Sequence, residues 1–287
     1  MSPLVAYAAC ALLIGVDLVA RAGRFFLFAR GAGHPIGFGD VFVLNVFGDA
    51  AAAVTPLRIA GQPARLVGLM HAGLSGAASV AVLAVEAASY YGVVVLIALW
   101  VAIGFAPEWW TSVGPGVLAT LRDALPWVAL LAVLSALAVW MVRRGTASHN
   151  RAGRALRQML EEVGRASRGP LLLSTPLALL SVGSRMAVLP VLAQTLPEPP
   201  PLAVLATGSF ALLYGQLFIP IPAGAGAVEL AVAGGAAGDM GAGVAPVLFA
   251  WRVFTLGIGL ALGLALGLPR YGWSAVRGVL GWKAKGG

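Results

Sequence analysis

Long apolar runs dominate this sequence and limit the folds that it can adopt. A membrane-spanning helix needs about 20 apolar residues, whereas only 10% of this chain is charged, compared with roughly 25% in soluble domains. The runs are rich in Leu, Ala and Val and do not alternate, which argues against an outer-membrane barrel. We therefore predict an all-α polytopic membrane protein, one transmembrane domain over 1–287, with about 8–9 transmembrane or re-entrant helices. The predicted segments are 3–20, 38–56, 66–86, 90–106, 125–142, 170–193, 202–219, 226–240 and 245–268.

Several functional classes lack their signatures. The single cysteine, Cys10, excludes an internal disulfide framework, and His34, His71 and His149 show no ligand spacing, so we expect no metal site. A Walker loop, GxSxG and HExxH are all missing. We therefore expect neither an ATP-driven pump nor an enzyme, and no cofactor. The net charge of +8 is explained by basic cytoplasmic loops rather than by nucleic acid.

The charges predict an orientation in the membrane. Basic residues concentrate after Trp140, in the linker 107–169, and in the tail 271–287. The loop after Trp140 and the tail are therefore expected to be cytoplasmic, as are Arg21, Arg24 and Arg30 after the first segment, whereas 107–123 is expected outside. The acidic, proline-rich loop 194–201 is expected outside. Within the linker, 151–168 predicts an amphipathic surface helix with Leu156, Met159, Leu160 and Val163 on one side.

Two similar breaks interrupt the apolar runs and suggest an internal repeat. Residues 56–65 read PLRIAGQPAR and residues 220–229 read PIPAGAGAVE; the matching AGLSGA and AGDMGA follow at 72–77 and 237–242. We predict a first repeat at 1–106 and a second at 170–270, inverted in the membrane by the intervening crossings. Inverted repeats with broken helices indicate a transporter whose site lies between the repeats. We expect segments 38–56 and 226–240 to cross; the alternative is that both dip in and return.

Ionisable side chains inside membrane segments face the protein interior or a water-filled cavity. The candidate substrate-binding residues are Arg65, Arg185, Glu229 and Arg252, with Asn45, Asp49 and Gln216 as further polar groups; Asp17, Arg58 and Glu86 are other intramembrane charges. Arg is suited to phosphate because its guanidinium binds two oxygens at once. Structural pairing is the alternative, with Arg65 opposite Glu229 and Glu86 opposite Arg252. Glu229 is also a candidate proton carrier.

The prolines and glycines of the two breaks are candidates for hinges or broken-helix positions, because proline interrupts a helix and glycine permits turns. They are Pro56, Gly61, Pro63, Pro220, Pro222, Gly224 and Gly226.

At these breaks the chain resembles the transmembrane-domain family of lysylphosphatidylglycerol synthase, a group of flippase-like membrane proteins. Its motifs, P-x-x-x-GG-x-P-x-R and P-x-P-GG-x-G-x-x-E, match here apart from alanines where a second glycine is common, at Ala60 and at Ala223 or Ala225. Arg252 corresponds to the arginine that ends the following helix. The resemblance implies a lipid-translocating module without the aminoacyl-transferase domain.

We therefore expect a flippase or scramblase of the bacterial inner membrane that moves a phospholipid or another lipid-linked anionic substrate. Two alternatives stay open: a non-transporting anchor of a lipid-modifying or glycosyl-transferring enzyme, and an ion-coupled small-solute transporter. The expected partners are membrane lipids with anionic headgroups, with a lipid-modifying enzyme as the alternative and no nucleic acid. The oligomeric state is left open.

Overall fold

The computed structural model describes residues 1–104, 170–215 and 243–272, and short stretches between 122 and 164 (122–123, 126, 129–130, 133, 137, 140, 157–161 and 163–164). Its helices are α1 (Pro3–Gly31), α2 (Phe38–Ala53), α3 (Gly61–His71), α4 (Gly76–Gly104), α7 (Pro170–Ala193), α8 (Leu202–Gly215), α10 (Val244–Arg252), η3 (Val253–Gly257), α11 (Ile258–Leu262) and η4 (Gly263–Gly267). Every regular element described is helical, which confirms the predicted class.

Four helices among the described residues are long and apolar enough to cross a membrane: α1, α4, α7 and the helix Ala245–Gly272 that runs from α10 through η4. The protein is therefore a multi-pass membrane protein. The predicted segment 170–193 coincides with α7, and the predicted segment 245–268 lies within the terminal helix. Most of the predicted segments 125–142 and 226–240 lies outside the described residues.

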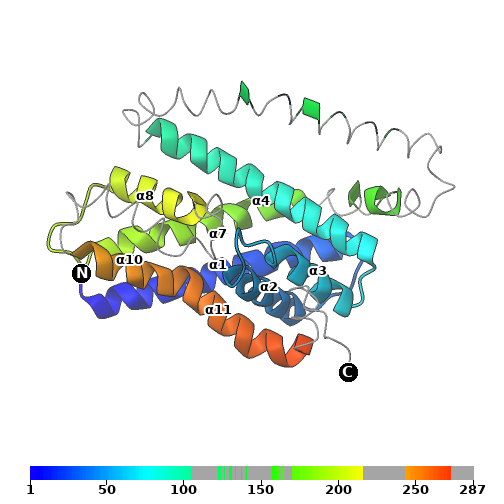
Figure 1. Ribbon diagram of the computed structural model, residues 1–287, viewed down its shortest axis with the longest axis horizontal. Helices are drawn as coiled ribbons and strands as arrows, with labels where there is room; N and C mark the ends of the chain where they lie inside the picture. Colours follow the sequence, from blue (N-terminus) through cyan, green and yellow to red (C-terminus); the bar gives the residue numbers. More distant parts are fainter. Residues whose placement is uncertain are drawn as a thin grey trace.

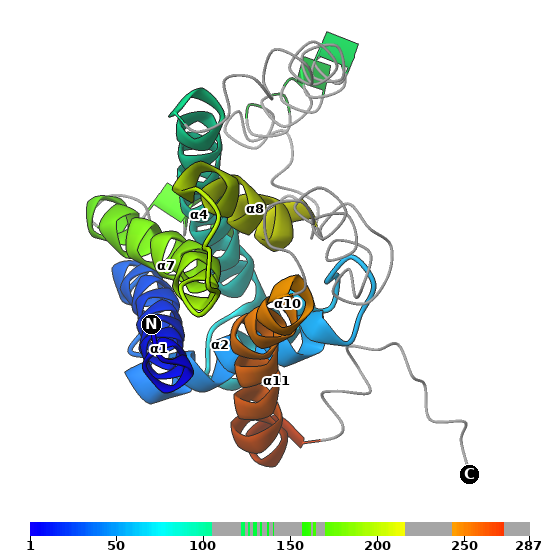
Figure 2. The ribbon, with the colours of Figure 1, turned by 90° about the vertical axis from the view of Figure 1, so that its left-hand side faces the viewer.

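Helices α1 and α7 pack side by side as an antiparallel pair (Figures 1 and 2). The Cys10 thiol contacts the carbonyl of Val188 at 3.8 Å. About two turns further along α1, Asp17 accepts a hydrogen bond from Ser181 of α7. Helix α4 crosses over α7 and contacts α8, while the terminal helix packs on α2. Leu189, Leu205 and Trp251 belong to the apolar cluster that joins α7, α8 and α10.

Helices α2 and α3 form a hairpin, which corrects the expectation that 38–56 is a crossing. At 1.5 Å per residue the two helices are about 24 and about 16 Å long, short of the roughly 30 Å hydrocarbon thickness. They pack antiparallel at close range. A Cβ added at Gly61 would lie 3.0 Å from that of Ala52, and one at Gly68 would lie 2.8 Å from that of Leu44. The small residues Gly61 and Gly68 thus let the two backbones approach.

Two further helix boundaries differ from the expectation. The first segment does not end near residue 20 but continues to Gly31, because Arg21 and Arg24 are paired inside the protein and need no aqueous loop. The predicted crossings 66–86 and 90–106 are instead the short α3 and one long helix, α4. Glu86 made the middle of α4 look like a boundary, but it is 6% exposed and paired.

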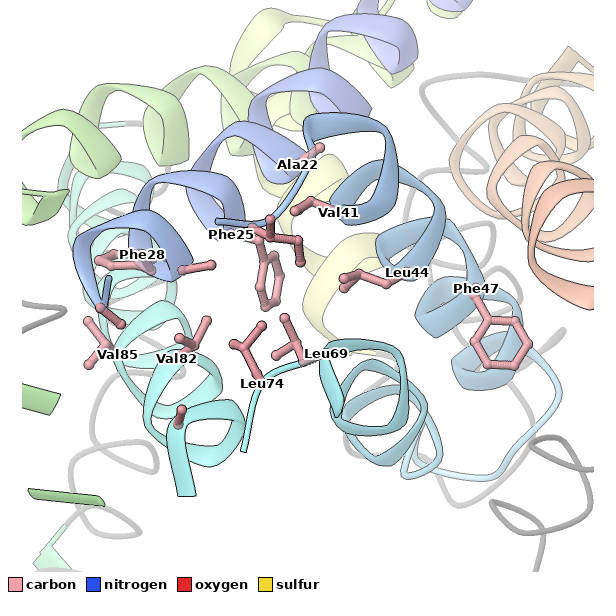
Figure 3. Close-up of a cluster of buried hydrophobic side chains, with 14 of the residues drawn as sticks. Ala22, Phe25, Phe28, Val41, Leu44, Phe47, Leu69, Leu74, Val82 and Val85 are labelled. Atoms are coloured by element: carbon pink, nitrogen blue, oxygen red, sulfur yellow. The ribbon is translucent and has the colours of Figure 1, made fainter. Parts of the chain in front are cut away.

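The hairpin rests on an apolar cluster that α1, α2, α3 and α4 share. Phe25 and Phe28 of α1, Leu44 of α2, Leu69 of α3 and Val82 of α4 are all buried in it. Figure 3 shows Phe25 turned toward Leu69 and Leu74, between the hairpin and α4. The cluster fixes the hairpin against the first and fourth helices and so positions the polar residues of α2 and α3.

The element order fits the predicted repeat. Helices α7, α8 and the terminal helix begin about 165 residues after α1, α2 and α4, respectively. Packing is reciprocal as well: α2 contacts α11 and η4, and α8 contacts α4. An inverted repeat would produce this exchange, but the second break, 220–229, lies outside the described residues, so the repeat stays a prediction.

The described part of the basic linker is consistent with the predicted amphipathic helix. Residues 157–161 are helical, with an Arg157–Glu161 ion pair at 3.4 Å. Met159 and Leu160 are partly buried, whereas Arg157 and Glu161 are exposed.

The hairpin turn contains two consecutive non-glycine residues in the left-handed region, Leu57 (φ 51°) and Arg58 (φ 57°). Thr55 supports the turn, since its hydroxyl accepts a hydrogen bond from the Ala60 amide at 3.2 Å. An L-residue in this region costs about 1–2 kcal/mol.

We predict that Leu57→Gly raises the free energy of unfolding by about 1 kcal/mol, because glycine adopts positive φ without strain and the Leu57 side chain is 43% exposed. Thermal unfolding in detergent would measure this. The matched control is Ile59→Gly at a neighbouring exposed position without positive φ, which should destabilise by roughly 0.5–1 kcal/mol. Equal losses from both substitutions would contradict the strain assignment.

Candidate functional site

A polar cavity of about 120 Å³ lies where the hairpin meets α1, α4, α7 and α8. Cationic, acidic and aromatic side chains share its wall. The lining residues are Arg21, Phe25, Asn45, Asp49, Arg58, Gln62, Arg65, Glu86, Ala87, Tyr90, Tyr91, Arg185, Leu213 and Tyr214. Since residues from both halves of the chain contribute, the fold rather than any one segment creates the cavity.

A continuous row of ion pairs runs along one side of the cavity and joins four helices. Asp49 of α2 accepts from Arg21 of α1 at 2.6 Å and from Arg65 of α3 at 2.8 Å. Arg21 also lies 3.0 Å from Asp17, and Asp17 lies 3.9 Å from Arg185 of α7. Both carboxylates are shared by two cations, so neither is free to neutralise another positive group.

Local sequence explains why α1 contributes so much. Asp17, Arg21 and Arg24 are spaced four and three residues apart, so they lie on one face of the helix. This spacing is the sequence signal that could have placed Arg21 in the site. The predicted segment 3–20 ended before Arg21 and so did not reveal the shared helix face. Gly48 has a matching role on α2, because a Cβ there would lie 2.6 Å from Cγ of Arg65. The missing side chain leaves room for Arg65 to reach Asp49.

A second, fully buried pair corrects one expected pairing. Glu86 of α4 accepts a hydrogen bond from Arg24 of α1, rather than from Arg252. The Arg24 side chain is 0% exposed and its Cζ lies 4.9 Å from the ring centre of Tyr90. Because the pair joins α1 to α4 beside the cavity, it holds Glu86 and Tyr90 in place.

Positive charge exceeds negative charge around the cavity. Counting its lining groups and their direct ion-pair partners, the described residues supply five guanidinium groups (Arg21, Arg24, Arg58, Arg65 and Arg185) and three carboxylates (Asp17, Asp49 and Glu86). Arg58, at the strained hairpin turn, makes no ion pair with a described residue. A cavity with two surplus cations suits an anionic ligand.

Neutral polar groups complete the wall. The hydroxyls of Tyr90 and Tyr214 are 3.1 Å apart and connect α4 to α8. Asn45 lies one helical turn before Asp49 and is 2% exposed, yet neither of its amide atoms has a hydrogen-bond partner among the described residues. A buried amide without partners costs about 1–3 kcal/mol, so a ligand that satisfies it would gain that free energy.

The predicted site residues divide into three groups. Arg65, Arg185, Asn45 and Asp49 all line the cavity. Arg252 does not; its Cζ lies 5.9 Å from the ring of the adjacent Trp251. Gln216 and Glu229 lie outside the described residues, so the predicted approach of Glu229 to Arg65 stays a prediction.

The hinge candidates of the first break all belong to the hairpin. Pro56 lies in its turn, Gly61 begins α3, and Pro63 follows within the first turn of α3, where a proline is tolerated. Those of the second break, Pro220, Pro222, Gly224 and Gly226, lie outside the described residues.

No three His, Cys, Asp or Glu side chains gather as a metal site would require in the part of the chain that the structure describes. The chemistry available at the cavity is therefore charge pairing and hydrogen bonding by guanidinium, carboxylate, amide and phenol groups.

Comparison with known proteins gives one match. The family model described as lysylphosphatidylglycerol synthase TM region covers residues 1–263 of the 287. No curated protein and no solved structure matches the chain.

Proposed function

Because the chain belongs to the family of the lysylphosphatidylglycerol synthase transmembrane region, we propose that it translocates a lipid with an anionic headgroup across the bacterial inner membrane. The family membership supports a role in lipid handling. The cavity between the hairpin and the α1–α7 pair would hold the headgroup, and the acyl chains would stay in the bilayer. We propose a transport role rather than an enzymatic one.

The observation that carries this proposal is the cluster of guanidinium groups inside a helical membrane protein. An arginine in the middle of a membrane segment costs about 2.5–3.5 kcal/mol, yet Arg21, Arg65 and Arg185 line one cavity. Charge pairing alone would need only as many cations as carboxylates. The surplus of cations among the described residues suits a phosphate, which accepts several charge-assisted hydrogen bonds.

The position of the cavity favours a lipid over a water-soluble solute. Two of its lining residues, Gln62 of α3 and Tyr91 of α4, are exposed, with Tyr91 at 49%, and we propose that the cavity opens to the bilayer on this side. The neighbouring α4 side chains Val95, Leu96 and Leu99 are exposed and apolar, as a lipid-facing surface would be. A headgroup could therefore enter sideways from the bilayer.

The shared carboxylate suggests how binding and release proceed. Asp49 holds Arg21 and Arg65 in the structure. An arriving phosphate competes with Asp49 for these guanidinium groups, and Asp49 takes them back when the lipid leaves. The arginines thus keep a partner throughout the cycle, which avoids the cost of an unpaired buried charge.

We predict that Arg65→Gln slows lipid translocation about tenfold to hundredfold, since a lost hydrogen bond between charged groups costs about 1.5–3 kcal/mol. Purified protein would be reconstituted into liposomes that contain acyl-labelled fluorescent phospholipid, and the outer-leaflet label would be quenched over time. The matched control is Arg157→Gln, at an exposed ion pair outside the cavity; it should stay within about twofold of the wild type.

Two outcomes would count against the proposal. If wild-type protein moves no tested lipid faster than empty liposomes do, lipid translocation is wrong. If Arg65→Gln and Arg157→Gln behave alike while the wild type is active, the phosphate does not bind at this cavity.

A further inference from the structure

We infer that the cavity selects one class of lipid headgroup: a phosphate ester that carries free hydroxyl groups and no amine. This inference rests on the proposed function and narrows its substrate. Asn45 would recognise the hydroxyl groups, and Arg58 would supply the positive charge that the carboxylates of the described residues leave unbalanced.

The charges of the cavity determine which headgroups it can accept. Asp49 is shared by two arginines, and so is Asp17, while Glu86 is held by Arg24. An ammonium group entering the cavity would meet no carboxylate among the described residues that lacks a cation. It would also add to the surplus of two positive charges that the described residues supply, and like charges at close range in a partly buried site repel strongly. A phosphate without an attached amine reduces the surplus instead.

Arg58 is the cation best placed to bind a ligand rather than the protein. It lines the cavity and makes no ion pair with a described residue, whereas Arg21, Arg65 and Arg185 each contact a carboxylate. The left-handed backbone at Leu57 and Arg58 sets the position of this side chain on the hairpin turn. Strained backbone of this kind persists where the surrounding structure enforces it, often at ligand-binding positions.

Asn45 adds a requirement for hydroxyl groups. Its amide presents two N–H donors and a carbonyl acceptor, is buried on α2 between the cavity and the hairpin core, and has neither donor nor acceptor partnered by a described residue. A hydroxyl group can both donate to the amide oxygen and accept from the amide nitrogen. An ammonium group can only donate, and a phosphate oxygen without hydrogen can only accept. A polyol therefore satisfies Asn45 better than either group alone.

The experiment compares four acyl-labelled lipids in liposomes that contain the full-length protein. Phosphatidylglycerol has a phosphate diester and hydroxyls, phosphatidylmethanol has the same phosphate diester without headgroup hydroxyls, and phosphatidylethanolamine has an amine without hydroxyls. Lysylphosphatidylglycerol has both a hydroxyl and amines. We expect phosphatidylglycerol to move about five times faster than phosphatidylmethanol, the effect of one neutral hydrogen bond, and at least about tenfold faster than either amine-bearing lipid.

Two variants separate the two parts of the inference. Asn45→Leu should slow phosphatidylglycerol toward the rate of phosphatidylmethanol, and a thermal unfolding curve of the same purified sample reports correct folding. Arg58→Gln should reduce the preference for anionic over amine-bearing lipids several-fold and keep the ratio of phosphatidylglycerol to phosphatidylmethanol. If Asn45→Leu leaves that ratio at its wild-type value, the hydroxyl assignment is wrong.

The remaining outcomes are also decisive. Equal rates for all four lipids would contradict the inferred selectivity but not the proposed lipid translocation. A lysylphosphatidylglycerol rate equal to that of phosphatidylglycerol would have the same consequence. Translocation of none of them would overturn both. A water-soluble ligand with the same phosphate and hydroxyl groups is tested with radiolabelled glycerol 3-phosphate trapped in the liposomes. Its release without any lipid movement would show that the ligand is not a lipid.

Discussion

Replacing Glu86 with Gln is expected to lower the free energy of unfolding by about 3–5 kcal/mol, the cost of leaving one charge of a buried pair without its partner. Arg24 is fully buried, and its Nη2 donates to the Glu86 carboxylate. Among the described residues, no other carboxylate lies within ion-pair distance of Arg24. Thermal or chemical unfolding in detergent micelles would measure the loss.

The double variant Arg24→Met with Glu86→Met is the control. Replacing both members of a buried pair with apolar residues of similar length is often neutral, so the double variant should recover most of the lost stability. A double variant less stable than either single variant would contradict this assignment. If Glu86→Gln is as stable as the wild type, the ion pair does not hold α1 to α4.

Gly263→Ala should destabilise the protein by up to about 3 kcal/mol, the upper end of the usual cost of overpacking. The terminal helix passes so close to α2 that a Cβ at Gly263 would lie 2.2 Å from the carbonyl oxygen of Val46 and 2.6 Å from Cβ of Ala50. Backbone cannot yield as a flexible side chain can, so the two helices must separate. Because α2 carries Asn45 and Asp49, translocation should fall together with stability.

The matched control is Gly257→Ala in the same helix. Among the described residues, a Cβ at Gly257 would meet only Val253, at an ordinary 3.8 Å, and alanine is a better helix former than glycine by about 1 kcal/mol. The two identical substitutions are therefore expected to change stability in opposite directions. If the two substitutions change the stability by a similar amount in the same direction, close contact with α2 does not limit the size of the side chain at position 263.

The distinction between crossing and hairpin shows where local pattern stops being informative. The stretch 38–56 is apolar enough for a membrane segment, and hydropathy alone favours a crossing. The chain instead turns at Pro56 to Ala60, and glycines at positions 61 and 68 allow α3 to pack back along α2. Whether an apolar run crosses or returns depends on the surface against which it packs, and that surface comes from distant helices.

The sequence predicted several residues of the site but not their partners. Intramembrane charge identified Arg65, Arg185 and Asp49 as candidates, and the four-residue spacing placed Asn45 beside Asp49; all four line the cavity. The same reasoning paired Glu86 with Arg252 and placed Arg24 in a cytoplasmic loop, and both of these assignments were wrong. A sequence shows that a buried charge needs a partner, but it does not identify the partner.

By itself, the sequence determined that this chain is a helical membrane protein, where its charges and helix breaks lie, and to which family it is similar, because hydrophobic length and short motifs are local properties. Only the tertiary structure decided that α2 and α3 form a hairpin, that Asp49 is shared by two arginines, and that Asn45 faces the same cavity without a hydrogen-bond partner among the described residues. These features depend on contacts between residues far apart in the chain. They arise when antiparallel packing of α1 and α7 brings the two halves together.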